Sequence, residues 1–385
     1  MKLIFSDESL PTTLSHSIFL AGPSPRDKHT LDWRVQALEI LESLGFKGEV
    51  FIPIPRNKFY GQDDDPSWTY THQIEWECAA RQMSDKILFW VARDIEGKMP
   101  GFTTNVEFGE DLNSGKLIYG RPDSAQKCRY LDKRIEDKGQ SVYNDLATFL
   151  KASIEALGLA NIRQGGECFV PLFIWRTDQF QSWYQALQLA GNRLDWAEVE
   201  YVKMVGKVVF AYSLKVHVWV EVEKRLKSNE FIFSRKDISS VLAYYVDDIK
   251  QDVAIVLVKE FRSPVANKEG FVYELPGGSS FKPAVDPKQN AQHELHEETG
   301  ILIENTSRFE WVSTRQIVAT LCTHQAHLYR VRLSEKEFNE IQSEQSFGME
   351  EDSEKTYVQI LWYKDVKKSL IDYATLGMIT EALIQ

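Results

Sequence analysis

The sequence predicts two folded domains, an α/β doubly wound parallel sheet followed by an α+β sandwich. Its 385 residues, of which 43% are apolar and 26% are charged, are enough to bury two hydrophobic cores. Over roughly the first 120 residues, apolar strands alternate with amphipathic helices, which is typical of a parallel sheet covered on both faces. From Lys207 onward the chain is rich in strand-forming residues, and this stretch leads into one helix with clear ends.

The first domain opens with a buried strand, Ser17–Ala21, that ends at the turn residues Gly22 and Pro23. An amphipathic helix follows over residues 30–44 and stops at Gly45. The alternation continues with apolar strands at 50–53, 86–91 and 117–120 and with helices near 73–83 and 105–114. Because ligands of such sheets bind at the carboxyl ends of the strands, we expect a ligand site beyond Gly22.

The domain boundary is predicted in a polar, glycine-bearing segment. An amphipathic helix runs from residue 143 to 157, and residues 159–167 then read as a linker. A strand is expected at 169–175 and a helix from Asp178 to Ala190, stopped by Gly191. We therefore assign residues 1–158 to the first domain, 159–195 to a linker and helical connection, and 196–385 to the second domain.

Composition narrows the class of partner. The net charge of −11 disfavours nonspecific binding to nucleic acid, and no apolar run approaches the roughly 20 residues that a membrane helix needs. The N-terminus lacks the apolar core of a signal peptide, and the four cysteines show neither metal-ligand nor disulfide spacing. We expect a cytoplasmic protein that binds small phosphorylated molecules, with no nucleic acid or membrane partner.

Three carboxylates mark the second domain. Glu294, Glu297 and Glu298 stand at i, i+3 and i+4, so they share one face of a helix. Such crowding of like charge is tolerable mainly where a hard divalent cation, Mg²⁺ or Mn²⁺, compensates it. The pattern therefore favours metal-assisted cleavage of a phosphate ester or anhydride over a merely solvated acidic helix.

The helix that carries these acids has readable limits. Asp286 is a plausible N-cap, Pro287 occupies the first helical position, and Gly300 follows the last turn. Gly277 and Gly278 precede it, and glycines there let backbone N–H groups approach a metal-bound pyrophosphate closely.

This segment resembles the Nudix box, and the flanking Glu260–Arg262 and Glu274–Pro276 resemble the ADP-ribose pyrophosphatase branch of that family. The resemblance implies a Nudix-type sandwich, nucleotide contacts at Gly277, Gly278 and Arg262, a metal on Glu294, Glu297 and Glu298, and a catalytic role for Glu297. It also implies a general base from the acidic segment 348–354, where Glu351 and Glu354 are candidates. His293 stands where the family has arginine, and Val285 stands near the place of the family's upstream glutamate.

Three motifs in the first domain, at 18–23, 84–89 and 105–109, have the order and spacing of nucleoside 2-deoxyribosyltransferase-like proteins, which residues 14–135 resemble. The resemblance implies that Glu107 attacks the anomeric carbon of a nucleoside and that Asp85 helps to hold the nucleoside. The alternative for Glu107 is a helix-terminal acid favoured by the macrodipole, and for Asp85 a turn acid at a strand entry. Arg26 is a candidate contact for the 5′-phosphate of a nucleotide, and the alternative is an exposed loop arginine. Gly101 falls near the place of a second family acid.

The leading hypothesis is a Mg²⁺-dependent Nudix hydrolase that cleaves a phosphoanhydride of a nucleotide, fused to a domain that binds or cleaves N-glycosidic bonds. The substrate would be a nucleoside triphosphate, including one with a deaminated or modified base, or a nucleoside diphosphate derivative such as ADP-ribose. The alternative, motivated by Val285, His293 and Gly101, is a nucleotide sensor without turnover. By analogy with both families, we expect a homodimer.

Overall fold

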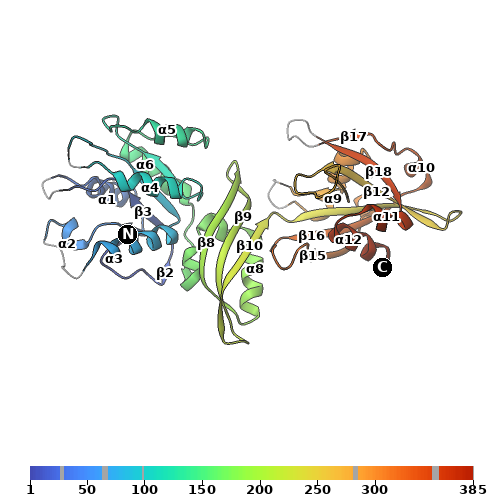
Figure 1. Ribbon diagram of the computed structural model, residues 1–385, viewed down its shortest axis with the longest axis horizontal. Coiled ribbons are helices and arrows are strands. Elements are labelled where there is room, and N and C mark those ends of the chain that lie inside the picture. Colours follow the sequence, from blue (N-terminus) through green and yellow to red (C-terminus); the bar gives the residue numbers. More distant parts are fainter. Residues whose placement is uncertain (27–29, 63–67, 98, 281–284, 349–354, 385) are drawn as a thin grey trace. The chain divides into compact units, whose positions relative to one another are not determined.

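The computed structural model describes residues 1–26, 30–62, 68–97, 99–280, 285–348 and 355–384. It divides into two compact units, Met1–Phe233 and Ser234–Gln385. Figure 1 labels the helices and strands of both units.

The first unit contains a five-stranded sheet in which every neighbouring pair of strands is parallel. The buried strands are rich in β-branched and aromatic residues, as expected for a sheet covered on both faces. The predicted parallel sheet is therefore confirmed, whereas its edge strand β1 was not predicted. In sheet order, the strands are β1 (Lys2–Phe5), β4 (Glu49–Ile52), β3 (Ser17–Ala21), β5 (Lys86–Trp90) and β6 (Leu117–Gly120).

Helices cover both faces of this sheet (Figure 1). On one face, α1 (Trp33–Ser43) and α6 (Leu146–Leu157) pack over Ile18, Leu20 and Leu88. On the other face, α3 (Tyr70–Met83), α4 (Phe102–Asp111) and α5 (Arg129–Glu136) pack over the alternate residues of the same strands. The short helix α2 (Arg56–Phe59) follows β4.

The rest of the first unit is an antiparallel sheet with its own aromatic core. In order, its strands are β10 (Arg225–Arg235), β9 (Val208–Val220) and β8 (Arg193–Val205). Phe180, Tyr184 and Tyr212 are buried in the core between this sheet and the preceding helices. These helices are η1 (Gly165–Phe169), α7 (Leu172–Trp175) and α8 (Asp178–Leu189). The short strands β2 (Thr13–Leu14) and β7 (Arg163–Gln164) pair with each other.

Two sequence assignments in this region need correction. The segment 169–175 was predicted as a strand, but Phe169 ends a 3₁₀ helix and Pro171 caps the short helix α7, so its apolar run packs as helical turns. The domain boundary was predicted at 158 and 195, but the three-stranded sheet contacts η1, α7 and α8 of the same unit. Residues 196–233 therefore belong to the first compact unit, and the division falls at Phe233.

The second unit is one mixed sheet with helices on both faces. Its described strands run in the order β15 (Glu310–Gln316), β16 (Gln325–Arg332), β11 (Ile238–Asp247), β12 (Asp252–Phe261), β18 (Thr356–Trp362) and β17 (Ser346–Phe347), with β13 (Phe271–Glu274) on β12 and β14 (Gly277–Gly278) on β11. Helix α9 (Pro287–Thr299) covers one face. Helices α11 (Tyr363–Ser369) and α12 (Tyr373–Ile384) cover the other. The short η2 (Thr306–Arg308) and α10 (Glu335–Asn339) complete the unit.

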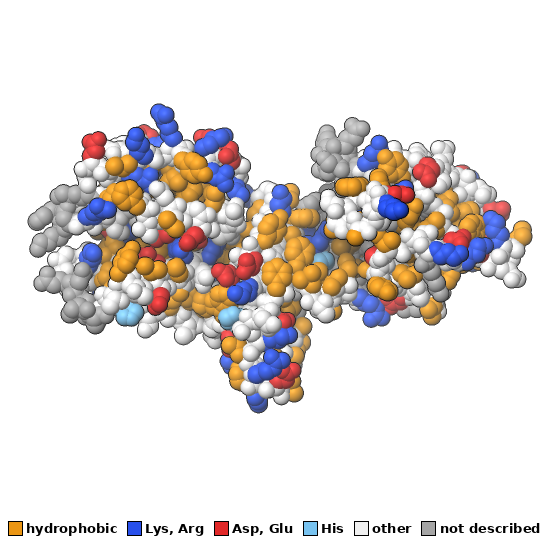
Figure 2. Space-filling view, in the orientation of Figure 1, with side chains coloured by type: hydrophobic (Ala, Val, Ile, Leu, Met, Phe, Trp, Pro, Cys, Tyr) orange, Lys and Arg blue, Asp and Glu red, His pale blue; other side chains and the backbone are white. Residues whose placement is uncertain are grey.

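The surface carries both signs of charge. On the face drawn in Figure 2, Lys and Arg side chains are interspersed with Asp and Glu side chains over both units. Among the described residues, no helix is both long enough and apolar enough to span a bilayer.

Candidate functional site

The first unit holds a cavity of about 1000 Å³ at the carboxyl edge of its parallel sheet. This is the edge at which the sequence predicts a ligand site. The walls are the turn after β3 (residues 22–26), the turn after β4 (residues 53–55), the first half of α3 and the first turns of α4. Arg26 and Lys58 are exposed cations on this wall, and Tyr60, Tyr70 and Phe102 add exposed aromatic rings.

The turn after β3 is shaped by Gly22 and Arg34. Gly22 has a φ of +146°, and a Cβ placed on it would lie 2.3 Å from the carbonyl oxygen of Trp90 on the neighbouring strand β5. Glycine is therefore required where the two strand ends meet. The fully buried Arg34 donates hydrogen bonds to the carbonyl oxygens of Leu20 and Gly22, at 2.9 and 2.8 Å, and so fixes the turn from below.

Two carboxyl groups meet on the cavity wall. Glu77 comes from α3 and Glu107 from α4; both line the cavity, and their side chains are hydrogen-bonded to each other. Burial, and next the neighbouring charge of Glu77, raise the pKa of Glu107 to about 7. Burial also raises the pKa of Glu77, so this pair holds a proton at pH values where single carboxyls are ionised.

Two buried arginines set the electrostatic surroundings of the pair. Arg81, one helical turn beyond Glu77, is ion-paired with Asp111 and Glu110 of α4, each at 2.7 Å. Arg81 and Arg34 both act to lower the pKa of Glu107, but burial and the Glu77 charge outweigh them. The positive charges stabilise one carboxylate in the pair without ionising both.

Glu107 therefore lies in the cavity, as the sequence predicts, and Glu77 is the residue that sequence reasoning missed. The pattern Trp76-Glu77 gave one available signal. Trp76 is buried against Phe19 and Phe51, which orients α3 and turns the next residue toward α4.

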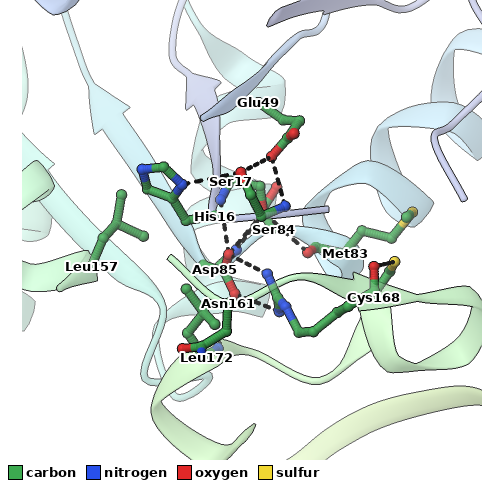
Figure 3. Close-up of polar contacts among 12 residues, drawn as sticks. His16, Ser17, Glu49, Met83, Ser84, Asp85, Leu157, Asn161, Cys168 and Leu172 are labelled. Carbon is green, nitrogen blue, oxygen red and sulfur yellow. Dashed lines mark hydrogen bonds and ion pairs between the residues drawn. The ribbon is translucent and has the colours of Figure 1, made fainter. Parts of the chain in front are cut away.

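Asp85 lies elsewhere, and its expected role in holding a nucleoside is corrected. It directly precedes β5, at the amino edge of the sheet and away from the cavity lining, with only 1% of its surface exposed. Its carboxylate accepts two hydrogen bonds from Arg163, at 2.8 and 2.6 Å, and others from the backbone N–H groups of Ser17 and Leu172 (Figure 3). These donors leave it no free face for a ligand, so Asp85 ties the 163–172 segment to the sheet.

In the second unit, the predicted helix α9 is confirmed in its limits. Asp286 caps it by accepting from the N–H of Lys288, Pro287 begins it, and Gly300 ends it with a φ of +71°. The position where the Nudix family has arginine is His293, which lies 3.0 Å from Glu297.

The α9 acids divide into two sets. Glu298 accepts a hydrogen bond of 2.8 Å from the N–H of Gly277, and a Cβ placed on Gly278 would lie 2.7 Å from the Glu294 carboxylate. Glu294 and Glu298 thus lie against the β14 glycines, whereas Glu297 pairs with His293. Among the residues that the structure describes, no group of three or more His, Cys, Asp or Glu side chains is gathered closely enough to hold a metal ion.

Arg262 lies among carboxylates of the same region. Its guanidinium is 2.8 Å from Glu260 and 2.9 Å from Glu274. The charges of Glu274, Glu260 and Glu298 raise the pKa of Arg262 against the opposing effect of burial. The predicted base candidates Glu351 and Glu354 lie outside the described residues.

The first unit is an α/β domain with a parallel sheet and a cavity, lined by two carboxyl groups, at the carboxyl edge of that sheet. Residues 15–124 match the family model described as nucleoside 2-deoxyribosyltransferase like. No curated protein matches the chain. Among solved structures, the chain is similar to the NUDIX domain of Shewanella oneidensis NrtR complexed with ADP ribose, at 17% identity and a TM-score of 0.29, over 39% of this chain and 86% of that one. The family match includes both Glu77 and Glu107.

Proposed function

We propose that the first unit cleaves or transfers the N-glycosidic bond of a nucleoside or nucleotide, with Glu107 and Glu77 as its catalytic carboxyls. One observation carries this proposal: two carboxyl groups that are hydrogen-bonded to each other lie on the wall of a cavity large enough for a nucleotide. Pairs of carboxyls in such different protonation states suit chemistry in which an oxocarbenium-like centre forms while a base departs. The match of residues 15–124 to a deoxyribosyltransferase-like family supports the same chemistry.

The pair can supply both charge and proton. Attack by Glu107 requires its carboxylate form, and the hydrogen bond allows Glu77 to hold the proton at that moment. A Glu107 oxygen then bonds to the anomeric carbon, the C–N bond breaks with its electron pair on the base, and the proton of the pair passes to the base. Water or a second base would release the glycosyl group from Glu107.

The test is release of free base by the full chain. Nucleosides, deoxynucleosides and their 5′-monophosphates would be incubated with the protein and the products read by mass. Glu107→Gln and Glu77→Gln should each reduce release at least about a hundredfold, because each removes one member of the acid–base pair. Glu155→Gln, an exposed acid on α6, is the matched control. Undiminished release by Glu107→Gln would contradict the proposal.

A second activity is favoured in the second unit by the contact of Glu294 and Glu298 with the β14 glycines. Carboxylate oxygens are the ligands that Mg²⁺ and Mn²⁺ prefer, and both Glu294 and Glu298 lie against the β14 glycines, where Glu298 accepts from the N–H of Gly277. Such an ion would polarise a phosphoryl oxygen and lower the pKa of an attacking water. We therefore propose metal-dependent hydrolysis of a nucleotide phosphoanhydride, with Glu294, Glu297 and Glu298 as the metal-binding acids and Arg262 near the phosphates.

This second activity is measured separately, as Mg²⁺-dependent phosphate or pyrophosphate release from ADP-ribose and nucleoside triphosphates. Glu297→Gln and Glu298→Gln should abolish release, and Glu304→Gln, an exposed acid of the same unit, should not. Undiminished release by Glu297→Gln would rule out its place in the metal set. Calorimetric binding of intact nucleotide without any product would instead favour the sensor hypothesis.

A further inference from the structure

The carboxylate of Glu77 is held by a second polar side chain of the cavity wall. Gln73, one turn earlier on α3, donates from its amide nitrogen to a Glu77 oxygen at 2.6 Å. The same nitrogen donates to the carbonyl oxygen of Pro53, after β4, at 2.8 Å. The amide oxygen of Gln73 accepts from the indole N–H of Trp68 at 3.1 Å. Trp68, Gln73 and Glu77 therefore form a chain of hydrogen bonds that ends at Glu107.

The hydrogen bonds from Trp68 through Gln73 to Glu77 can run in only one direction. An indole N–H can only donate, so the Gln73 atom that faces Trp68 must be its oxygen. A backbone carbonyl can only accept, so the atom that faces Pro53 must be the nitrogen. The amide orientation of Gln73 is thus fixed by its two outer partners, independently of Glu77. The oxygen of Glu77 that meets Gln73 must then accept a hydrogen bond.

The hydrogen bond between Glu77 and Glu107 requires one proton, because two ionised carboxylates cannot donate to each other. We infer that Gln73, oriented by Trp68 and Pro53, is a positioning residue that keeps Glu77 ionised and so places the shared proton on Glu107. The catalytic meaning of this arrangement rests on the proposed glycosidic chemistry. It specifies the resting state of the pair: Glu77 is the proton acceptor, and Glu107 ionises for attack by passing its proton to Glu77.

The charged groups around the pair do not determine which of the two carboxyls carries the proton. Arg34 and Arg81 lower the pKa values of both Glu77 and Glu107, and Asp111 raises that of Glu107. The hydrogen bond from Gln73 lowers the pKa of Glu77, and Gln73 is not among the main influences on the pKa of Glu107. Its donor is therefore the group that acts on one carboxyl and not the other.

The test follows each carboxyl by its infrared C=O absorption, which reports protonation without any substrate. In a Glu107→Gln background, Gln73→Met should raise the pH at which Glu77 titrates by about one unit, because it removes a donor to the charged form. In a Glu77→Gln background, Gln73→Met should leave the titration of Glu107 unchanged. Trp68→Phe, which frees the amide of Gln73, should give a smaller shift of Glu77 in the same direction.

Gln82→Met is the matched control, since Gln82 lies on the same helix and also donates to a glutamate, Glu198, but outside the cavity. An unchanged Glu77 titration in both Gln73→Met and Trp68→Phe would overturn the inference, as would an equal shift of Glu107 in the absence of Glu77. Because no substrate is involved, the expected titrations together with absent base release would sink the proposed activity and leave the assignment of the proton intact.

Discussion

Glu107 occupies its position at a cost in stability. Its pKa of about 7 lies above the ordinary value of 4.5, so the native state binds its proton more tightly than the unfolded chain does. The contribution of this raised pKa to the stability of the folded state is fully present below about pH 4.5 and is lost as the pH rises through 7. Removing the ionisable group should therefore stabilise the protein under neutral conditions, as often happens at functional sites.

We expect Glu107→Gln to raise the free energy of unfolding by roughly 1–3 kcal/mol at pH 8 and to change it little at pH 4.5. Chemical denaturation of the full chain at the two pH values measures this. The exposed Glu155→Gln serves as the control, with no pH-dependent gain. A gain of the same size at both pH values would show that packing, not ionisation, accounts for the effect.

Asp85, in contrast to Glu107, stabilises the folded state in its ionised form. Its pair with Arg163 is almost fully buried, with exposed fractions of 1% and 0%. Replacing Asp85 by Asn leaves the Arg163 charge uncompensated, so the first unit should lose about 3–5 kcal/mol of stability. The measurement is denaturation followed by tryptophan fluorescence. Asp137→Asn, which breaks the exposed pair with Lys133, should have little effect. Adding Arg163→Met should recover part of the loss; no recovery would argue against an uncompensated charge as its cause.

Asp85 and Glu77 show what a motif can and cannot predict. Both are acids of the α3–β5 region, eight residues apart, and the sequence singled out the one beside the apolar strand. Which edge of the sheet each reaches depends on strand direction and on Arg163, 78 residues away from Asp85. Glu107 was predictable because its helix follows a strand end, at the edge where parallel sheets place their ligands, although α4 begins at Phe102 and Glu107 lies about one turn and a half inside it. Glu77 follows the buried Trp76 in the sequence, but its place beside Glu107 depends on the packing of α3 against α4.

At the scale of elements, α9 was predicted in full because its limits are local. A capping aspartate, a proline at the first position and a terminal glycine each act within one turn of the helix. The segment 169–175 was predicted wrongly because its apolar run is too short for periodicity to separate strand from helix. The edge strand β1 was not predicted since only pairing with β4 defines it. The acidic candidates Glu351 and Glu354 remain a prediction.

The β14–α9 contact yields a paired prediction on glycines. Gly278→Ala should displace the Glu294 carboxylate, because the new Cβ would lie 2.7 Å from it. Mg²⁺ binding, measured by calorimetry, should weaken in this variant. Gly377→Ala in α12 adds a Cβ that meets nothing within 4 Å, and should stabilise the second unit by roughly 0.5–1 kcal/mol through helix propensity. Unchanged Mg²⁺ affinity in Gly278→Ala would exclude a metal at Glu294.

At the scale of the whole molecule, the two compact units have separate hydrophobic cores. Three clusters of buried residues lie in the first unit and two in the second, and none of the five includes buried residues of both. The sequence predicts two domains from length and pattern, but places the boundary too early. The three-stranded sheet resembles the second unit in its strand-rich sequence, but it packs against elements of the first unit. Packing, and not composition, determines to which unit the sheet belongs.

Separate cores imply separate unfolding, because each unit loses its buried apolar surface cooperatively within itself. We expect calorimetry of the full chain to resolve two transitions. Asp85→Asn should lower the temperature of one, and Gly377→Ala should raise that of the other by a few degrees. The two variants also show which transition belongs to which unit, since each substitution lies within one unit only. A single transition that moves with both substitutions would show that the 385 residues unfold as one cooperative body, and the division at Phe233 would then describe contacts but not stability.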